Sequence, residues 1–98
     1  MANYRLSNEA KEDLIRIHQY GVRKFGINQA DKYFDSFFRC FDTIANQPFS
    51  FEAVDYIKRG YRRCVCGVDS IYYRINNDTV EIMAIIGRQD LKNISHKD

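Results

Sequence analysis

The residues best able to act on an anionic target are arginines in the last third of the chain, with two polar neighbours. They are Arg62, Arg63, Arg74 and Arg88, followed by Gln89 and Asp90. Cleaving RNA at a 2′-hydroxyl needs a base, an acid and cations around the phosphate, and guanidinium groups supply only the cations. The two histidines do not complete this set, because His18 falls in an expected helix and His96 in an expected C-terminal tail. The pattern favours binding to an acidic partner, and no catalytic residue is expected.

The three cysteines, Cys40, Cys64 and Cys66, suggest a second chemistry. Cys64 and Cys66 are two residues apart in an expected strand, so their thiols share a face. With Cys40 or His18 they could bind zinc, but the spacing is not that of a zinc knuckle. Small buried apolar side chains are the simpler interpretation. The sequence also lacks a glycine-rich phosphate loop, a carboxylate cluster and a Ser-His-acid arrangement, so neither a metal nor a cofactor is expected.

The composition predicts one globular domain over residues 1–98. Hydrophobic residues make up 45% and charged residues 29% of the chain, as in folded rather than disordered proteins. A net charge of +2 is too small for an autonomous DNA-binding domain, so sequence-specific nucleic-acid binding by the chain alone is not expected. The odd cysteine count, without a signal segment or a long apolar run, predicts a cytoplasmic protein with no membrane association.

The first elements expected along the chain are a short strand and a helix. Residues 3–6 read as an extended segment, and Ser7 is placed to cap the helix that follows. Gly26 is placed to end that helix with a positive φ angle. The apolar face of this helix recurs at helical spacing and consists of Ala10, Leu14, Ile17, Gly21 and Phe25.

A second helix is expected to follow after a two-residue linker, giving a helical hairpin. Asn28 is the expected cap, and Pro48 stops the helix. Its wide apolar stripe, rich in phenylalanine, predicts packing on both the first helix and a sheet. Residues 49–59 fit no clean period and are interpreted as an ordered loop.

Three strands are expected in the last third, over residues 61–66, 71–75 and 79–86, joined by turns rich in Gly, Asn and Asp. Neighbouring strand residues point to opposite faces, which places Arg62 and Arg63 on different sides of the sheet. The same rule predicts that one of Tyr72 and Tyr73 is core and the other surface. Alternation in the last strand predicts a central strand with one apolar face made by Val80, Ile82, Ala84 and Ile86.

Several motifs, in order and at matching spacing, resemble those of the RelE/ParE toxins over nearly the whole chain. Tyr4-Arg-Leu-Ser-Asn-Glu-Ala-Lys-Glu-Asp-Leu14 resembles the first strand and acidic first helix of ParE-type toxins. Ile44-Ala-Asn-Gln-Pro48 is similar to the end of their second helix. Gly60-Tyr-Arg-Arg and Tyr72-Tyr-Arg74 resemble their strand motifs, and Gly87-Arg-Gln-Asp90 resembles their closing His/Gly-Arg-Gln-Asp.

The resemblance implies an α+β fold in which a short N-terminal strand and a helical hairpin precede a three-strand antiparallel meander. It implies the toxin of a type II toxin–antitoxin pair, neutralised by a cognate antitoxin, ParD-like or of another family. ParE-type toxins inhibit DNA gyrase by protein–protein binding, whereas RelE-type toxins are ribosome-dependent mRNA endonucleases. Because no tyrosine follows the last expected strand, a non-enzymatic gyrase inhibitor is preferred. The endonuclease, or a toxin fold inert towards gyrase, is the alternative.

Two surfaces are expected to carry these interactions. The candidates for binding gyrase are Arg62, Arg63, Tyr73, Arg74, Arg88, Gln89 and Asp90. The candidates for binding the antitoxin lie on the two helices and are Leu14, Ile17, Phe34 and Phe38. Such apolar stripes can form a groove into which an amphipathic segment of a partner packs.

Overall fold

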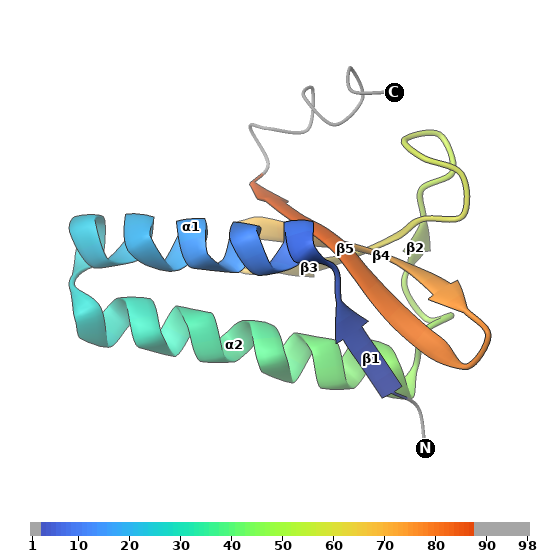
Figure 1. Cartoon of the computed structure of the whole chain (residues 1–98), viewed down its shortest axis with the longest axis horizontal. Coiled ribbons are helices and arrows are strands. Elements are labelled where there is room, and N and C mark those ends of the chain that lie inside the picture. Colours follow the sequence, from blue (N-terminus) through green and yellow to red (C-terminus); the bar gives the residue numbers. More distant parts are fainter. Residues whose placement is uncertain (1–2, 88–98) are drawn as a thin grey trace.

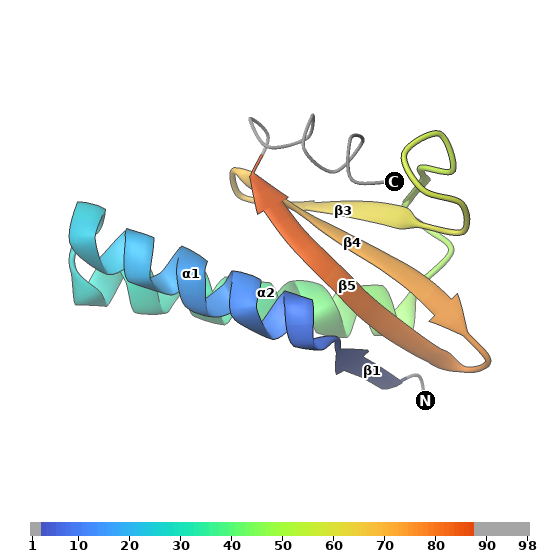
Figure 2. The same ribbon diagram turned by 45° about the horizontal axis from the view of Figure 1, so that its top comes forward.

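A computed structural model of the chain describes residues 3–87. In order, the elements are β1 (Asn3–Leu6), α1 (Asn8–Phe25), α2 (Ile27–Asn46), β2 (Glu52–Ala53), β3 (Arg62–Cys66), β4 (Asp69–Asn76) and β5 (Thr79–Gly87). The strands form one sheet in the order β1-β5-β4-β3-β2. Figure 1 shows the helical hairpin packed beside this sheet, and Figure 2 separates β3, β4 and β5. The predicted α+β order is confirmed, with β2 as a short additional strand in the expected loop.

The first strand and the start of α1 together cover the edge of β5. β1 pairs with β5 in parallel, whereas the other neighbouring strands are antiparallel. β1 is shorter than β5 and pairs with only the first part of it. The cap and first turns of α1 bond to the backbone of β5 beyond that part. Ser7 Oγ donates to the Met83 carbonyl at 3.0 Å, and the Ile85 N–H donates to Asp13 Oδ2 at 2.9 Å. These bonds satisfy backbone groups that a bare strand edge would leave open.

The helix ends follow the sequence signals in part. Ser7 caps α1 as predicted, its Oγ accepting the Ala10 N–H at 3.0 Å. The prediction that Asn28 caps α2 is wrong, because the helices are joined by Gly26 alone and Asn28 already lies inside α2. Gly26 has a φ of 91°, a value that glycine reaches without strain, so the chain reverses within one residue. Phe25, expected on the buried face, is 64% exposed because the hairpin tip extends past the sheet (Figure 1).

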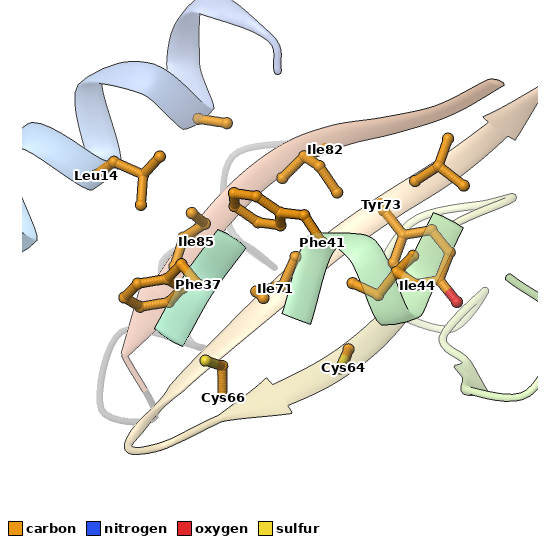
Figure 3. Packing of buried hydrophobic residues seen from close by; sticks show 12 residues of the cluster. Leu14, Phe37, Phe41, Ile44, Cys64, Cys66, Ile71, Tyr73, Ile82 and Ile85 are labelled. Atoms are coloured by element: carbon orange, nitrogen blue, oxygen red, sulfur yellow. The ribbon is translucent and has the colours of Figure 1, made fainter. Parts of the chain in front are cut away.

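One core lies between the hairpin and the sheet. Figure 3 shows Phe37, Phe41 and Ile44 of α2 directed at side chains of β3, β4 and β5. All three are fully buried. Their spacing of three to four residues puts them on one helical face, as the phenylalanine-rich stripe predicts. The strand residues of this helix-side core are Cys64, Cys66, Ile71, Tyr73, Val80, Ile82 and Ile85.

A β-bulge at Met83 changes which side chains of β5 face the helices. Tyr72 lies opposite Ala84 but Tyr73 lies opposite Ile82, so Met83 is the extra residue between them. The predicted alternation is therefore wrong beyond the bulge. Ile85 joins the helix-side core, whereas Ala84 belongs to a second core on the other side of the sheet. The buried members of the second core are Val54, Ile57, Tyr61, Tyr72 and Ala84.

Tyr72 and Tyr73 are both buried, with 1% and 0% of their surfaces exposed. The prediction that one of them reaches the surface is wrong, although they do point to opposite faces. The reason is that the segment expected as an irregular loop packs Val54 and Ile57 over Tyr72. On the other side, the Tyr73 hydroxyl donates to the Pro48 carbonyl at 2.6 Å, which ties β4 to the end of α2.

The turn between β3 and β4 depends on a glycine that meets the ring of Tyr33. Gly67 has a φ of 61°, and a Cβ there would lie 2.5 Å from Tyr33 Cε1. The ring cannot move freely, since its hydroxyl donates to Asp69 Oδ2 at 2.7 Å and accepts the Val68 N–H at 3.2 Å. The tyrosine of α2 therefore holds the strand turn in place.

Gly67→Ala is expected to lower the free energy of unfolding by about 2–4 kcal/mol, combining a backbone penalty with overpacking against Tyr33. Gly60→Ala is the matched control, because Gly60 has a φ of 82° and open space where its Cβ would be. That variant should lose only the backbone part, about 1–2 kcal/mol. Urea unfolding of both variants measures the difference. Equal losses in the free energy of unfolding would show that the Tyr33 ring moves aside without destabilising the fold.

Candidate functional site

The sheet separates the predicted target-binding arginines. Arg62 lies opposite Tyr73 and so shares the side of the helices, while Arg63 lies opposite Tyr72 on the other side. This confirms that the two neighbours point to opposite faces. Arg74 follows Tyr73 in β4 and therefore points to the same side as Arg63. We call the side of the sheet away from the helices the outer face.

A row of three charged side chains crosses the outer face from β1 to β4. Arg5 Nε donates to Glu81 Oε2 at 2.9 Å, and Arg74 Nε donates to Glu81 Oε1 at 2.6 Å. The Glu81 side chain is only 8% exposed, whereas those of Arg5 and Arg74 are 64% and 48% exposed. One buried carboxylate thus positions two exposed guanidinium groups, and the row keeps a net positive charge. Sequence reasoning missed Arg5, because only the pairing of β1 with β5 brings it to Glu81.

Glu81 makes the stability of the fold depend on pH. The guanidinium groups of Arg5 and Arg74 lower the pKa of Glu81 from its ordinary 4.5 to about 2. A carboxylate whose pKa is lowered by folding stabilises the native state above its unfolded pKa. That contribution is lost as the pH falls towards the folded pKa. The window for this loss therefore runs from 4.5 down to about 2.

Glu81→Gln is expected to lower the Tm at neutral pH, and the gap from the unmodified protein should close as the pH falls from 4.5 to about 2. Thermal unfolding of both proteins across this range measures the gap. Glu12→Gln, at an exposed position of α1, is the control and should change the Tm little at any pH. A gap for Glu81→Gln that stays constant through the acid range would contradict the ion-pair origin of the effect.

Arg62 and Arg63 are both engaged by the chain just after α2. An Arg62 guanidinium nitrogen donates to the Phe51 carbonyl at 2.7 Å, and its Cζ lies 5.2 Å from the centre of the Phe49 ring. Arg63 Nη2 donates to Glu52 Oε1 at 2.6 Å. Both arginines therefore fasten the segment around β2 to β3.

The amino-acid sequence matches one known protein family over most of its length. The profile of the family described as the ParE toxin of the type II toxin–antitoxin system parDE matches residues 4–92. The chain belongs to the ParE toxin family. Toxin ParE1 of Caulobacter vibrioides is 34% identical over 86 residues, covering 88% of both chains. Toxin ParE1 of Mycobacterium tuberculosis is 27% identical over 86 residues, covering 87% of this chain and 88% of its own.

Solved structures share the fold of this toxin. The chromosomal ParDE toxin–antitoxin system of Pseudomonas aeruginosa includes a chain that superposes with a TM-score of 0.79 at 17% identity, covering 89% of this chain and 96% of that one. The toxin–antitoxin complex RelBE2 of Mycobacterium tuberculosis includes one with a TM-score of 0.67 at 15% identity, covering 89% and 98%. At these identities the likeness establishes the fold alone.

Of the remaining target-binding candidates of the toxin, only Tyr73 lies among the described residues. Tyr73 lies in the helix-side core, and burial raises its pKa to about 12, so it is not a surface residue. Arg88, Gln89 and Asp90 lie outside the described residues. The same holds for His96.

The antitoxin candidates of the toxin are also of two kinds. Leu14 is 4% exposed and belongs to the helix-side core, whereas Ile17, Phe34 and Phe38 are half-buried and pack against its edge. His18 lies beside them, its Nε2 2.8 Å from Asp31 Oδ1. Four other apolar side chains of the hairpin, which the sequence analysis did not name as antitoxin candidates, are more than half exposed. They are Ile15, Tyr20, Phe25 and Ile27.

Two further sequence expectations concern metals and membranes. Within residues 3–87, no group of three or more His, Cys, Asp or Glu side chains is arranged to hold a metal ion. All three cysteines of the toxin have free thiols. Neither helix of the described part combines the length and apolar character needed to cross a bilayer.

Proposed function

We propose that this toxin inhibits DNA gyrase by protein–protein contact in the cytoplasm, and that a cognate antitoxin neutralises it. Membership of the ParE family supports the class of target. The proposed contact surface is the outer face. The observation that supports it is that buried Glu81 orients the exposed side chains of Arg5 and Arg74. Guanidinium groups held in this way bind carboxylates of a partner with little loss of side-chain freedom.

The proposed target surface consists of the outer face and the chain that continues from it. Arg5 and Arg74 form its centre, and Arg63 lies on the same face beside Tyr72. Arg62 points to the other side of the sheet and contributes to stability rather than to this surface. The sequence-based candidates Arg88, Gln89 and Asp90 stay part of the proposal.

A binding function without chemistry of its own is supported by the placement of the groups that could exchange protons. His18, the only histidine among the described residues, lies between the helices and contacts Asp31 and Phe34. Burial raises the pKa of Tyr33 and Tyr73, so their hydroxyls act as hydrogen-bond donors inside the fold. None of these three side chains lies on the outer face, where Arg5 and Arg74 are exposed.

The antitoxin is proposed to pack on the helical hairpin. The solved relatives come from ParDE and RelBE2 toxin–antitoxin systems, which supports a partner of this kind for this chain. The half-buried Ile17, Phe34 and Phe38 offer anchoring points for an amphipathic segment, and the exposed Tyr20 and Phe25 could extend the contact. Alanine at Phe34 or Phe38 should weaken binding of the antitoxin, and unchanged affinity in both variants would remove the hairpin from the proposal.

Purified gyrase tests the proposed target directly. Supercoiling and DNA-cleavage assays with the toxin are run beside a ribosome-dependent mRNA cleavage assay, with and without the antitoxin. Lost supercoiling or trapped cleavage with intact mRNA, reversed by antitoxin, is the expected result. Cut mRNA with normal gyrase would place the toxin with the endonucleases of the same fold. No effect in either the gyrase assays or the mRNA cleavage assay would identify a toxin fold inert towards gyrase.

A further inference from the structure

Three thiols line one groove beside β3, away from both surfaces proposed above. The groove has a volume of about 500 Å³ and lies between α2 and β3. Cys40 of α2 forms part of one wall, and Cys64 and Cys66 of β3 form part of the other. The proposed contacts with gyrase and antitoxin use none of these residues, and the helix-side core needs only their small apolar volume.

Cys40 and Cys66 are close together across the groove. The Cys66 thiol donates to the Ser36 carbonyl at 3.8 Å, and Ser36 Oγ lies 3.7 Å from the same sulfur. In an α-helix the Ser36 carbonyl also accepts the N–H of the residue four positions on, which is Cys40. The Cys66 sulfur therefore lies beside the helical turn that ends at Cys40. Besides burial, interaction with the Cys40 side chain is a further cause of the raised pKa of Cys66, and it partly offsets the raised pKa of Cys64, so Cys40 lies near both strand thiols.

The three thiols differ in access to solvent. Cys64 and Cys66 are 6% and 5% exposed, and burial raises the pKa of both, to about 12 for Cys66. Cys40 is half-buried and opens onto the groove beside the exposed Arg39. Because oxidants react with exposed thiolates, Cys40 is the thiol that an oxidant in the groove meets first.

We propose that Cys40 and Cys66 form an oxidation site, in which hydrogen peroxide entering the groove joins α2 to β3 by a disulfide. The Cys40 thiolate attacks one peroxide oxygen, the O–O bond breaks, and the hydroxide that leaves takes up a proton to give water. Cys66 sulfur then attacks the Cys40 sulfenic acid, its proton passing to the departing hydroxyl as a second water. The two thiols together give up two electrons, and the peroxide accepts them.

The test treats the native protein with hydrogen peroxide, blocks remaining thiols after denaturation, and maps the products by mass spectrometry. The unmodified protein should lose two hydrogens, and fragmentation of the linked peptides should place the bridge between Cys40 and Cys66. Dithiothreitol should reverse it. Cys40→Ser should form no bridge, and Cys66→Ser should stop at a sulfenic acid on Cys40 that dimedone traps. Cys64→Ser is the matched control and should still form the bridge.

Several results would overturn the proposal. A bridge to Cys64 instead of Cys66, or links only between two chains, would show that the geometry of the groove does not select this pair. Oxidation of Cys40 beyond the sulfenic acid without a bridge would show that Cys66 is out of reach. The mapping of the unmodified protein decides between these results even if a serine variant fails to fold.

Discussion

Tyr73→Ala is expected to lower the free energy of unfolding by about 3–5 kcal/mol, the usual cost of removing a buried aromatic ring. The ring is fully buried in the helix-side core, close to Ile44 in Figure 3. A domain of this size has about 5–15 kcal/mol of stability, so the variant loses a large share of it. Urea unfolding measures the loss. Any fall in toxicity should follow the fall in folded protein.

The Tyr73→Phe variant distinguishes a structural role of Tyr73 from a role in binding the target. This variant keeps the ring and removes only the hydroxyl that donates to the Pro48 carbonyl at 2.6 Å. The free energy of unfolding should fall by about 1–3 kcal/mol, because the partly buried Pro48 carbonyl is left without its hydrogen-bond donor. Gyrase inhibition per folded molecule should stay unchanged. Lost inhibition with intact folding would return Tyr73 to the target surface, where the sequence alone placed it.

The elements that could be predicted from the sequence are those with local causes. Ser7 starts α1 because its own side chain accepts a backbone N–H three residues on. Pro48 follows the end of α2, since it cannot continue a helix. The turn at Asn77 has a φ of 57°, which asparagine tolerates better than most residues. Each of these signals depends on neighbours within four residues.

The features that could not be predicted depend on residues far apart in the chain. The bulge at Met83 reverses the facing of Ala84 and Ile85, and no alternating pattern reveals where a strand gains an extra residue. Arg5 meets Glu81 only because β1 pairs with β5, across 76 positions of sequence. The burial of both Tyr72 and Tyr73 could not be predicted, because the segment that covers Tyr72 has no regular period. The sequence therefore predicted that Arg62 and Arg63 point to opposite faces, but not that Arg74 shares its carboxylate partner with Arg5.

Arg74→Ala is expected to weaken gyrase inhibition about tenfold or more. A hydrogen bond from a charged group contributes about 1.5–3 kcal/mol, and each 1.4 kcal/mol is a factor of ten in affinity. The folded state should lose little, about 0–1 kcal/mol, because Arg74 is half-exposed and Glu81 keeps Arg5 as a partner. Titration of supercoiling inhibition with folded toxin measures the effect. Binding of the antitoxin should not change.

Arg16→Ala is the matched control for this loss. Arg16 is 58% exposed and pairs with Asp13 at 3.0 Å, so the variant removes a similar arginine from a similar ion pair on α1 instead of the outer face. It should leave gyrase inhibition unchanged. Equal inhibition by the Arg74→Ala and Arg16→Ala variants would show that the outer face does not contact gyrase.

Glu81→Gln separates the position of the arginines from their charge. The variant keeps both Arg5 and Arg74 but replaces the carboxylate that orients them with a neutral amide. If fixed orientation matters, inhibition should fall despite the gain of positive charge, because freely moving side chains lose more entropy on binding. If only charge matters, inhibition should rise as the row gains one positive charge. The direction of the change therefore distinguishes whether the proposed contact with gyrase depends on the orientation of the two arginines or on the charge of the row.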